Sequence, residues 1–287
     1  MQPSNYKYID AHSHPHDLKY EGRTDFLETL RADGGATIAI GTDYEISRQA
    51  IELAKKYDNI WATVGIHPAD NHVEVFDEKK FDELIELGQI TPNPSLNKEG
   101  RNVVVGIGEC GLDYFYFDKR FVGEDRQEKI NLEKERQKEV FIKQVEYALK
   151  KDLPIVIHGR PSKGSMDAYE DILNILEKHE GVRGHAHFFV GDKKIAERFL
   201  GIGFLLSFDG PITFTSEYDE VIKLAPLDML MIETDSPYAA PAPYRGQTNY
   251  PHYVVEVAKK IATLKNETLE NVLEITKQNA IKFFNLQ

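Results

Sequence analysis

Eight short apolar segments alternate with amphipathic segments along almost the whole chain, and this alternation constrains the fold more than any other feature of the sequence. The amphipathic segments include residues 45–59, 138–152, 166–180 and 192–203, where apolar residues recur at the three- and four-residue spacing of helices that pack by one face. The apolar segments are typical of buried strands and read KYIDAHSH, ATIAIGT, IWATVGIHP, VVVGIGECGLDY, LPIVIHGR, VRGHAHF, GFLLSF and LMIETDSP. Apolar strands that are each followed by a helix indicate a buried parallel sheet.

Eight such units favour an α/β fold of the closed (β/α)8 type, a TIM barrel, over an open doubly wound sheet. The length of 287 residues suits one barrel, and no segment resembles a linker, so residues 1–287 are predicted to form a single domain. Residues 89–102 and 118–130 are predicted to be loop insertions near the fourth strand. The last helical pattern, residues 269–284, is expected to pack against the outside of the barrel.

Polar residues that can bind metals stand at the ends of these strand segments. In TIM barrels the chemistry lies at the carboxyl-terminal ends of the strands, so these side chains are expected to meet there. Imidazoles together with carboxylates suit zinc and other first-row divalent ions. The residues are His12, His14, His67, Glu109, His158, His187 and Asp235.

Each of these residues, taken alone, also has a structural explanation. His67 can be a hydrogen-bonded residue at a strand end, Glu109 can form a salt bridge, and Asp235 can cap the next helix. The structural explanations are independent of one another, whereas one metal centre accounts for the strand ends together. The sequence therefore predicts a metal site at the carboxyl-terminal ends of the strands.

The overall charge limits the partners of the protein. A formal net charge of -12 argues against a broad basic surface for nucleic acid, although it says little about a small site dominated by metal ions. No run of about 18 apolar residues predicts a membrane span. The beginning of the sequence lacks the layout of a secretory signal, and a single cysteine excludes an internal disulfide, so a cytoplasmic location is expected. No stable protein partner is evident from the sequence.

Six motifs, in the order IDAHSH, GIHP, GIGECGLDY, LPIVIHGR, GHAHFFVG and IETDSPYAAPAPYRGQTN, carry a resemblance that spans essentially the whole chain. The sequence resembles the TatD family of metal-dependent deoxyribonucleases, within the amidohydrolase-like barrels. The resemblance implies two divalent ions, which would be Zn, Mg or Mn. It assigns His12, His14 and Asp235 to one ion, His158 and His187 to the other, and Glu109 to both as a bridge.

The sequence also departs from the family pattern. His16, followed by Asp17, stands where family members commonly carry an acidic residue two places after the HxH pair. Ala69 replaces the second histidine of the family's GxHPH motif. The two insertions could reshape the substrate groove, so the choice of substrate is less constrained than the metal chemistry.

The predicted function is hydrolysis of DNA phosphodiester bonds by a water that two metal ions activate, as in an exonuclease. Asp235 and Glu109 are the predicted catalytic residues, with Asp235 as the acceptor of the water's proton. Asp113 and Ser236 are expected to orient the ligands. The predicted substrate-binding residues are Arg160, which would hold a phosphate oxygen, Tyr114, which would stack on a base, and His67 and Arg245, which would line the groove.

The strongest alternative is a hydrolase of the same superfamily that acts on a small amide, lactone or phosphoester. Fold and metals do not separate this alternative from the nuclease, since one barrel hosts many chemistries. The net acidity of the chain favours the small-molecule hydrolase, while Arg160 favours the nuclease. A catalytically silent barrel is disfavoured because no expected ligand is missing.

Overall fold

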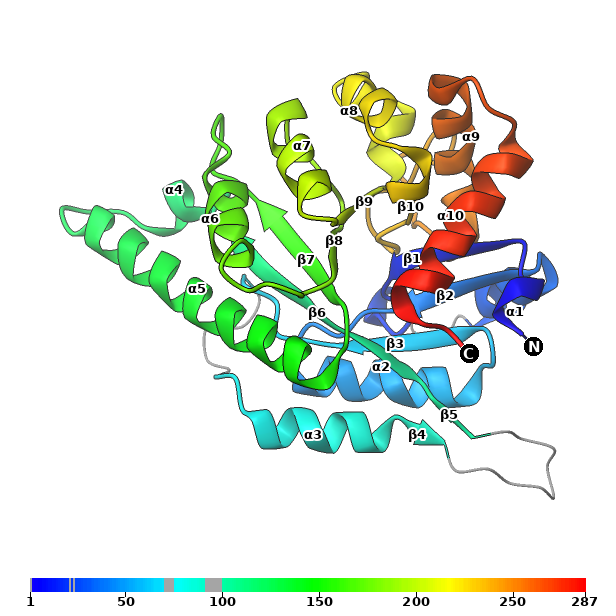
Figure 1. Cartoon of the computed structure of the whole chain (residues 1–287), viewed down its shortest axis with the longest axis horizontal. Helices are drawn as coiled ribbons and strands as arrows, with labels where there is room; N and C mark the ends of the chain where they lie inside the picture. Colours follow the sequence, from blue (N-terminus) through cyan, green and yellow to red (C-terminus); the bar gives the residue numbers. More distant parts are fainter. Residues whose placement is uncertain (1, 21, 23, 70–74, 91–99) are drawn as a thin grey trace.

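Eight parallel strands form a nearly closed barrel in the computed structural model, which describes residues 2–20, 22, 24–69, 75–90 and 100–287 (Figure 1). Each of the eight predicted segments overlaps one of these strands, so the predicted TIM barrel is confirmed. In their order around the barrel the strands are β1 (Tyr8–Ser13), β2 (Gly35–Ala39), β3 (Ile60–Val64), β6 (Val104–Asp113), β7 (Ile155–Arg160), β8 (Gly184–Ala186), β9 (Leu205–Phe208) and β10 (Leu230–Ile232).

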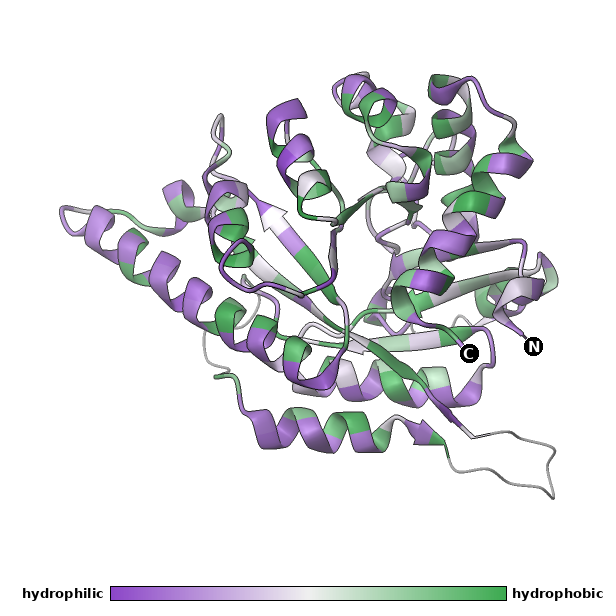
Figure 2. Cartoon of the chain, viewed as in Figure 1, coloured by the Kyte–Doolittle hydropathy of each residue, from purple (hydrophilic) through white to green (hydrophobic). Residues whose placement is uncertain are grey.

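Helices follow the strands and surround the barrel. Figure 2 shows hydrophobic residues along the strands and hydrophilic residues along much of the outer helix surfaces. Several helices begin at a polar side chain that accepts a hydrogen bond from a free backbone N–H of the first turn, as Asp43, Asp192 and Thr268 do. The helices are α1 (Asp25–Ala32), α2 (Tyr44–Lys56), α3 (Glu78–Leu87), α4 (Phe117–Arg120), α5 (Arg126–Lys151), α6 (Asp167–Leu176), α7 (Lys193–Gly201), α8 (Asp219–Leu224), α9 (Val254–Lys265) and α10 (Leu269–Phe284). None of the helices in the described ranges is long and apolar enough to cross a membrane.

The core has two parts, one between sheet and helices and one inside the barrel. Ile9 and Ala11 of β1 and Val156 of β7 belong to the inner part, together with Phe283 and Phe284 of α10. The end of α10 therefore closes the amino-terminal end of the barrel. The prediction that this helix packs against the outside holds only for its first half, where Val272 joins the outer part.

The two predicted insertions differ from the expectation. Gln89–Ile90 (β4) and Arg101–Asn102 (β5) form a small antiparallel pair directly before β6, at the amino-terminal end of the barrel, and residues 91–99 lie outside the described residues. The described part of this insertion therefore lies at the end opposite the predicted site. Residues 118–130 are largely helical, in α4 and the first turn of α5. Figure 1 shows the long helix α5, which packs against β6.

The helical structure of this second insertion follows from its charges. The segment is too polar to show a clear apolar stripe, and its ion pairs stabilise the helix instead. Lys129 and Asp125 are 2.8 Å apart within the insertion, at a spacing of four residues. Beyond it, Arg136 and Glu133 continue the pattern along α5 at 2.7 Å.

The barrel closes where β1 meets the segment after β10. Ser13 and Ser236 form a parallel bridge, and the amide of His14 donates to the carbonyl of Ser236 at 2.7 Å. The buried Asp10 carboxylate accepts hydrogen bonds from the backbone N–H of Thr234 at 2.9 Å and from its hydroxyl at 2.7 Å. These bonds bring the HSH and ETDS motifs together, although more than 200 residues separate them in the sequence.

Candidate metal centre

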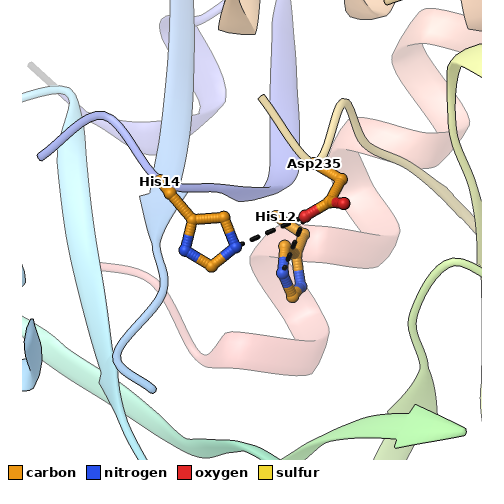
Figure 3. A group of neighbouring side chains, drawn as sticks. All are labelled: His12, His14 and Asp235. Atoms are coloured by element: carbon orange, nitrogen blue, oxygen red, sulfur yellow. Dashed lines mark ion pairs between the residues drawn. The ribbon is translucent and has the colours of Figure 1, made fainter. Parts of the chain in front are cut away.

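The first half of the centre lies across the seam between β1 and β10. His12 projects from β1, His14 follows its last residue, and Asp235 lies three residues after β10 (Figure 3). Asp235 Oδ1 is 3.3 Å from His14 Nε2 and 3.7 Å from His12 Nε2. Asp235 has a positive φ of 50°, and its amide donates to the carbonyl of His12 at 3.0 Å, so the seam itself holds this uncommon conformation.

Glu109 of β6 lies at the middle of the centre. Its Oε2 is 3.4 Å from His12 Nε2. Its Oε1 is 2.8 Å from His158 Nδ1, 2.8 Å from His187 Nε2 and 3.5 Å from His67 Nε2. The two oxygens of one carboxylate therefore face two different groups of imidazoles.

Glycine allows β6 and β7 to approach closely enough for this geometry. Gly111 has a φ of 143°, and a Cβ at this position would lie 2.0 Å from the carbonyl oxygen of His158. Any larger residue would push β7 away from β6. The GECG part of the motif thus holds Glu109 and His158 within hydrogen-bonding distance.

Two further carboxylates fix the orientation of two histidine rings. His158 directs Nδ1 to Glu109 and Nε2 to Asp113 Oδ2 at 3.1 Å. His187 directs Nε2 to Glu109 and Nδ1 to Glu233 Oε1 at 3.2 Å. Each outer carboxylate fixes one ring nitrogen, so the other nitrogen faces Glu109 and would offer its lone pair to a bound ion.

The charges of the metal-free centre are coupled. Burial opposes ionisation of Glu109, but the surrounding histidines, His187 and His67 foremost, hold its pKa well below its usual range. Burial lowers the pKa of His158, and its hydrogen bonds to Asp113 and Glu109 outweigh this and raise it to about 9. His187 likewise has its pKa raised well above the usual value by Glu109 and Glu233, against the effect of burial. Positive charge on His158 and His187 therefore balances the surrounding carboxylates.

His12 is the exception and gives the most direct test of whether a metal fits. Burial and the neighbouring His187, whose ring stacks on it at 3.7 Å, lower the pKa of His12. Within the described residues neither ring nitrogen of His12 has a hydrogen-bond partner, although the side chain is fully buried. A buried neutral imidazole with an unused nitrogen between two carboxylates is the chemistry of a metal ligand.

The described residues also form overlapping groups of donor atoms that could hold a metal ion. His12, His14 and Asp235 make one group, and His67, Glu109 and His158 make another. Two further groups also include His12. In one of them His12 joins Glu109 and His187, and in the other it joins His185 and Glu233. The six residues expected as ligands are thus brought together, and His67, which was expected to face the substrate, joins them.

A cavity of about 1210 Å³ opens above these residues and holds some of the predicted substrate-binding residues. His67 and Arg160 line it. Tyr114 does not, because its side chain is only 1% exposed and its hydroxyl donates to Asp171 at 2.9 Å. Arg245 does not line it either and lies over the ring of Phe214 at 4.2 Å. The expectation that Tyr114 and Arg245 face the groove is therefore not met.

Three residues of the site were missed from the sequence. Glu233 was overlooked because it precedes Asp235 in a strand that reads as apolar, and the signal available was a second carboxylate in the ETD motif. Asp10 carries the same kind of signal, as a carboxylate inside a buried strand. Phe115 takes the position in the cavity that was expected for its neighbour Tyr114.

Comparison with known proteins agrees with this geometry. The family model described as TatD related DNase matches residues 9–285. The chain belongs to this family. The TatD-family protein is 35% identical to the metal-dependent hydrolase YabD of Bacillus subtilis over 286 residues, covering 97% of this chain and 99% of YabD. It is 30% identical to the metal-dependent hydrolase YcfH of Escherichia coli, covering 97% and 96% of the two chains.

A solved structure supports the same conclusion. The crystal structure of YJJV, a TatD homologue of Escherichia coli, matches with a TM-score of 0.79 and 25% identity, covering 98% of this chain and 99% of that one. The resemblance read from the six motifs is confirmed. The protein is a TatD-family metal-dependent hydrolase.

Proposed function

We propose that this TatD-family hydrolase is a deoxyribonuclease that uses two divalent ions to hydrolyse phosphodiester bonds and removes nucleotides from an end of DNA. The observation that carries the proposal is that the two carboxylate oxygens of Glu109 face different histidines. Its Oε2 faces His12, and its Oε1 faces His158 and His187. A carboxylate placed in this way can bind two ions at once. Zn, Mg and Mn are the candidate ions.

The residues divide between the two ions as the geometry suggests. His12, His14 and Asp235 would hold one ion, His158 and His187 would hold the other, and Glu109 would contribute to both. Two bound ions would lower the pKa of an attacking water and neutralise the charge that develops on a phosphate.

Asp235 is the residue placed to accept the proton of the attacking water. Its side chain lines the cavity and is 17% exposed, compared with 5% for Glu109. A general base must lie within hydrogen-bonding reach of the proton that it removes. Both side chains line the cavity, but Asp235 is the more exposed of the two, and Glu109 is surrounded by histidines.

Arg160 is the residue placed to hold a phosphate oxygen. It is the last residue of β7, lines the cavity, and has a side chain that is 39% exposed. Its contact with Asp113 is long, at 4.0 Å, and Asp113 already accepts a hydrogen bond from His158. The planar guanidinium is thus available for two parallel hydrogen bonds to a phosphate.

A second candidate function is hydrolysis of a small amide, lactone or phosphoester. Two acidic side chains, Asp17 and Glu217, line the same cavity and would repel a long polyanion. This observation favours a small substrate with a polar or cationic group.

A panel of substrates separates the two candidates. The protein is assayed with single-stranded DNA, duplex DNA, RNA, bis-p-nitrophenyl phosphate, an amide and a lactone, each with added Mg²⁺, Mn²⁺ or Zn²⁺. DNA hydrolysis supports the nuclease, and turnover of the amide or lactone alone overturns it.

Arg160→Ala gives the sharper test. The variant's kcat/KM on a single-stranded oligonucleotide should fall by an amount that corresponds to about 1.5 to 3 kcal/mol of lost transition-state stabilisation, the scale of a hydrogen bond to a charged group. Arg160→Lys should restore only part of the lost kcat/KM. Lys163→Ala is the matched control, since Lys163 also lines the cavity but is exposed, and its effect should vanish at moderate salt. If Arg160→Ala digests DNA as fast as the parent at both salt levels, Arg160 holds no phosphate.

A further inference from the structure

Exposed aromatic side chains gather at the carboxyl-terminal end of the barrel. Among the described residues, four aromatic side chains are exposed: Phe115 and Tyr116 after β6, Phe214 after β9, and Tyr238 after β10. All four follow strand ends on the side of the metal centre, and Phe115 and Tyr238 line the cavity. Exposed rings at the mouth of one cavity indicate a surface for a ligand rather than for packing.

The wall after β6 and β7 combines a ring, a cation and a carboxylate. Arg160 Cζ lies 4.1 Å from the centre of the Phe115 ring and 4.8 Å from that of Tyr116. The amide of Phe115 donates to Asp113 Oδ1 at 3.0 Å, while the other oxygen of Asp113 holds His158. The position of the ring is therefore tied to a predicted metal ligand.

The wall after β10 and β1 repeats this combination. Lys19 Nζ lies 3.6 Å from the centre of the Tyr238 ring. Asp17 accepts hydrogen bonds from the Tyr238 hydroxyl at 2.8 Å and from the Lys19 amide at 2.7 Å. The Tyr238 ring also meets the ring of His14 edge to face, with centres 6.3 Å apart.

The two walls lie on opposite sides of the mouth. In the ring of eight strands β6 and β7 are fourth and fifth, while β10 and β1 are last and first and meet at the seam. Phe115 and Tyr238 therefore face the same cavity from opposite sides, with the metal centre between them. Phe115 is 36% exposed and Tyr238 is 44% exposed, so each side of the cavity mouth offers accessible aromatic surface.

We propose that Phe115 and Tyr238 form two base-binding subsites, one for the nucleotide on each side of the scissile phosphate. The proposal rests on the proposed nuclease function, because it places a phosphodiester at the metal centre. Each ring would stack on one base, and the cation over the ring, Arg160 or Lys19, would meet a phosphate beside that base. Stacking accepts every base, so the subsites recognise nucleotides without reading their sequence.

The subsites also account for how an acidic protein can bind a polyanion. The attraction comes from two local cations and two rings rather than from a broad basic surface, and it acts against the local carboxylates of Asp17 and Glu217. Each ring also limits the freedom of its cation, so less entropy is lost on binding.

The experiment uses the metal-loaded protein and two readouts. Calorimetry measures binding of a thymidine dinucleotide with a phosphorothioate linkage, and of its two analogues that lack one base each. Hydrolysis of a single-stranded oligonucleotide is measured in parallel. The variants are Phe115→Leu and Tyr238→Leu, and their metal content and melting temperature are compared with those of the parent.

Each leucine variant should bind the full dinucleotide about 5- to 150-fold more weakly than the parent. An analogue that lacks the base of one subsite should bind the variant of that subsite as tightly as it binds the parent. Phe115→Leu should therefore match the parent with one abasic analogue, and Tyr238→Leu should match it with the other. Tyr238→Phe keeps the ring and should retain most of the binding. Phe214→Leu is the matched control, since its ring is exposed at the same end and also carries an arginine but does not line the cavity, and it should bind as the parent does.

The outcomes separate this proposal from the proposed function. Hydrolysis of DNA together with unchanged binding in both leucine variants would overturn the subsites and leave the nuclease intact. The crossed pattern of losses without any hydrolysis of DNA would support the subsites and overturn the nuclease. Losses of the same size with both abasic analogues, or no binding by the parent, would overturn the subsites.

Discussion

Asp113→Asn tests whether the outer carboxylates set the metal affinity. Asp113 is 5% exposed and uses both oxygens: Oδ2 faces His158 Nε2 at 3.1 Å, and Oδ1 accepts from the Phe115 amide at 3.0 Å. Asparagine has the same shape but only one acceptor oxygen. Its NH₂ group must then face either the N–H of His158 or the N–H of Phe115, and one of these donors loses its partner.

The expected size follows from this loss. A partner that orients a metal-bound histidine is worth about 10- to 100-fold in metal affinity, which corresponds to about 1.4 to 2.7 kcal/mol. Only the affinity for the ion assigned to His158 and His187 should fall, because Asp113 bonds to His158, whereas His12, His14 and Asp235 contact one another and Glu109. The variant should therefore show one normal and one weakened site.

Competition with a chromogenic chelator measures both affinities, and elemental analysis measures the ions retained after dialysis. Glu233→Gln serves as the parallel variant, since Glu233 holds His187 in the same way and in the same half of the centre. Equal affinities of Asp113→Asn and the parent for both ions would refute the reasoning. An equal loss of affinity for both ions would show that Glu109 couples the two halves of the centre more strongly than the geometry suggests.

Three further predictions concern the centre itself. Glu109→Gln should lose at least one of two bound ions per chain, and full metal content by elemental analysis would remove the bridge. Asp235→Asn should lower kcat roughly 10²-fold or more, in line with loss of a general base, while the fold stays intact; near-normal kcat at normal metal content would mean that another residue is the base. The metal-free protein should lose stability as the pH rises. The folded pKa of His158, about 9, exceeds the usual histidine pKa of 6.5, so its contribution, on the order of 3 kcal/mol, is complete below pH 6.5 and is lost as the pH rises through 9. Denaturant unfolding of chelator-treated protein at pH 6 to 9.5 measures this, with His158→Gln as control; constant stability over this range would contradict it.

The barrel could be predicted from the sequence because parallel strands buried on both faces are continuous apolar runs. All eight runs carried this signal, and the expected ligands lay within five of them. The length of α5 could not be predicted in the same way, since ion pairs such as that of Lys129 with Asp125 stabilise its first turns without an apolar stripe. The role of α10 at the end of the barrel was also hidden, because an apolar stripe does not say which surface it covers.

The site was predictable at the level of donor residues but not of the side chains around them. Glu109 and the histidines have a chemistry that few structural roles require together. For Tyr114 and Phe115 the sequence offers two adjacent aromatic residues after one strand, and only the direction of each side chain decides which is buried. Tyr114 packs beneath the loop and bonds to Asp171, so Phe115 points to the cavity.

The position of the first metal half-site links function to the closure of the barrel. His12 and His14 belong to the first strand, and Asp235 follows the last, so an ion bound by all three joins the two edges of the sheet. The buried hydrogen bonds from Thr234 to Asp10 hold the same seam and keep these donor atoms close together. An ion that binds only the closed seam stabilises the folded state by mass action. The stretch HSH is therefore constrained twice, as a pair of ligands and as the edge along which the barrel closes.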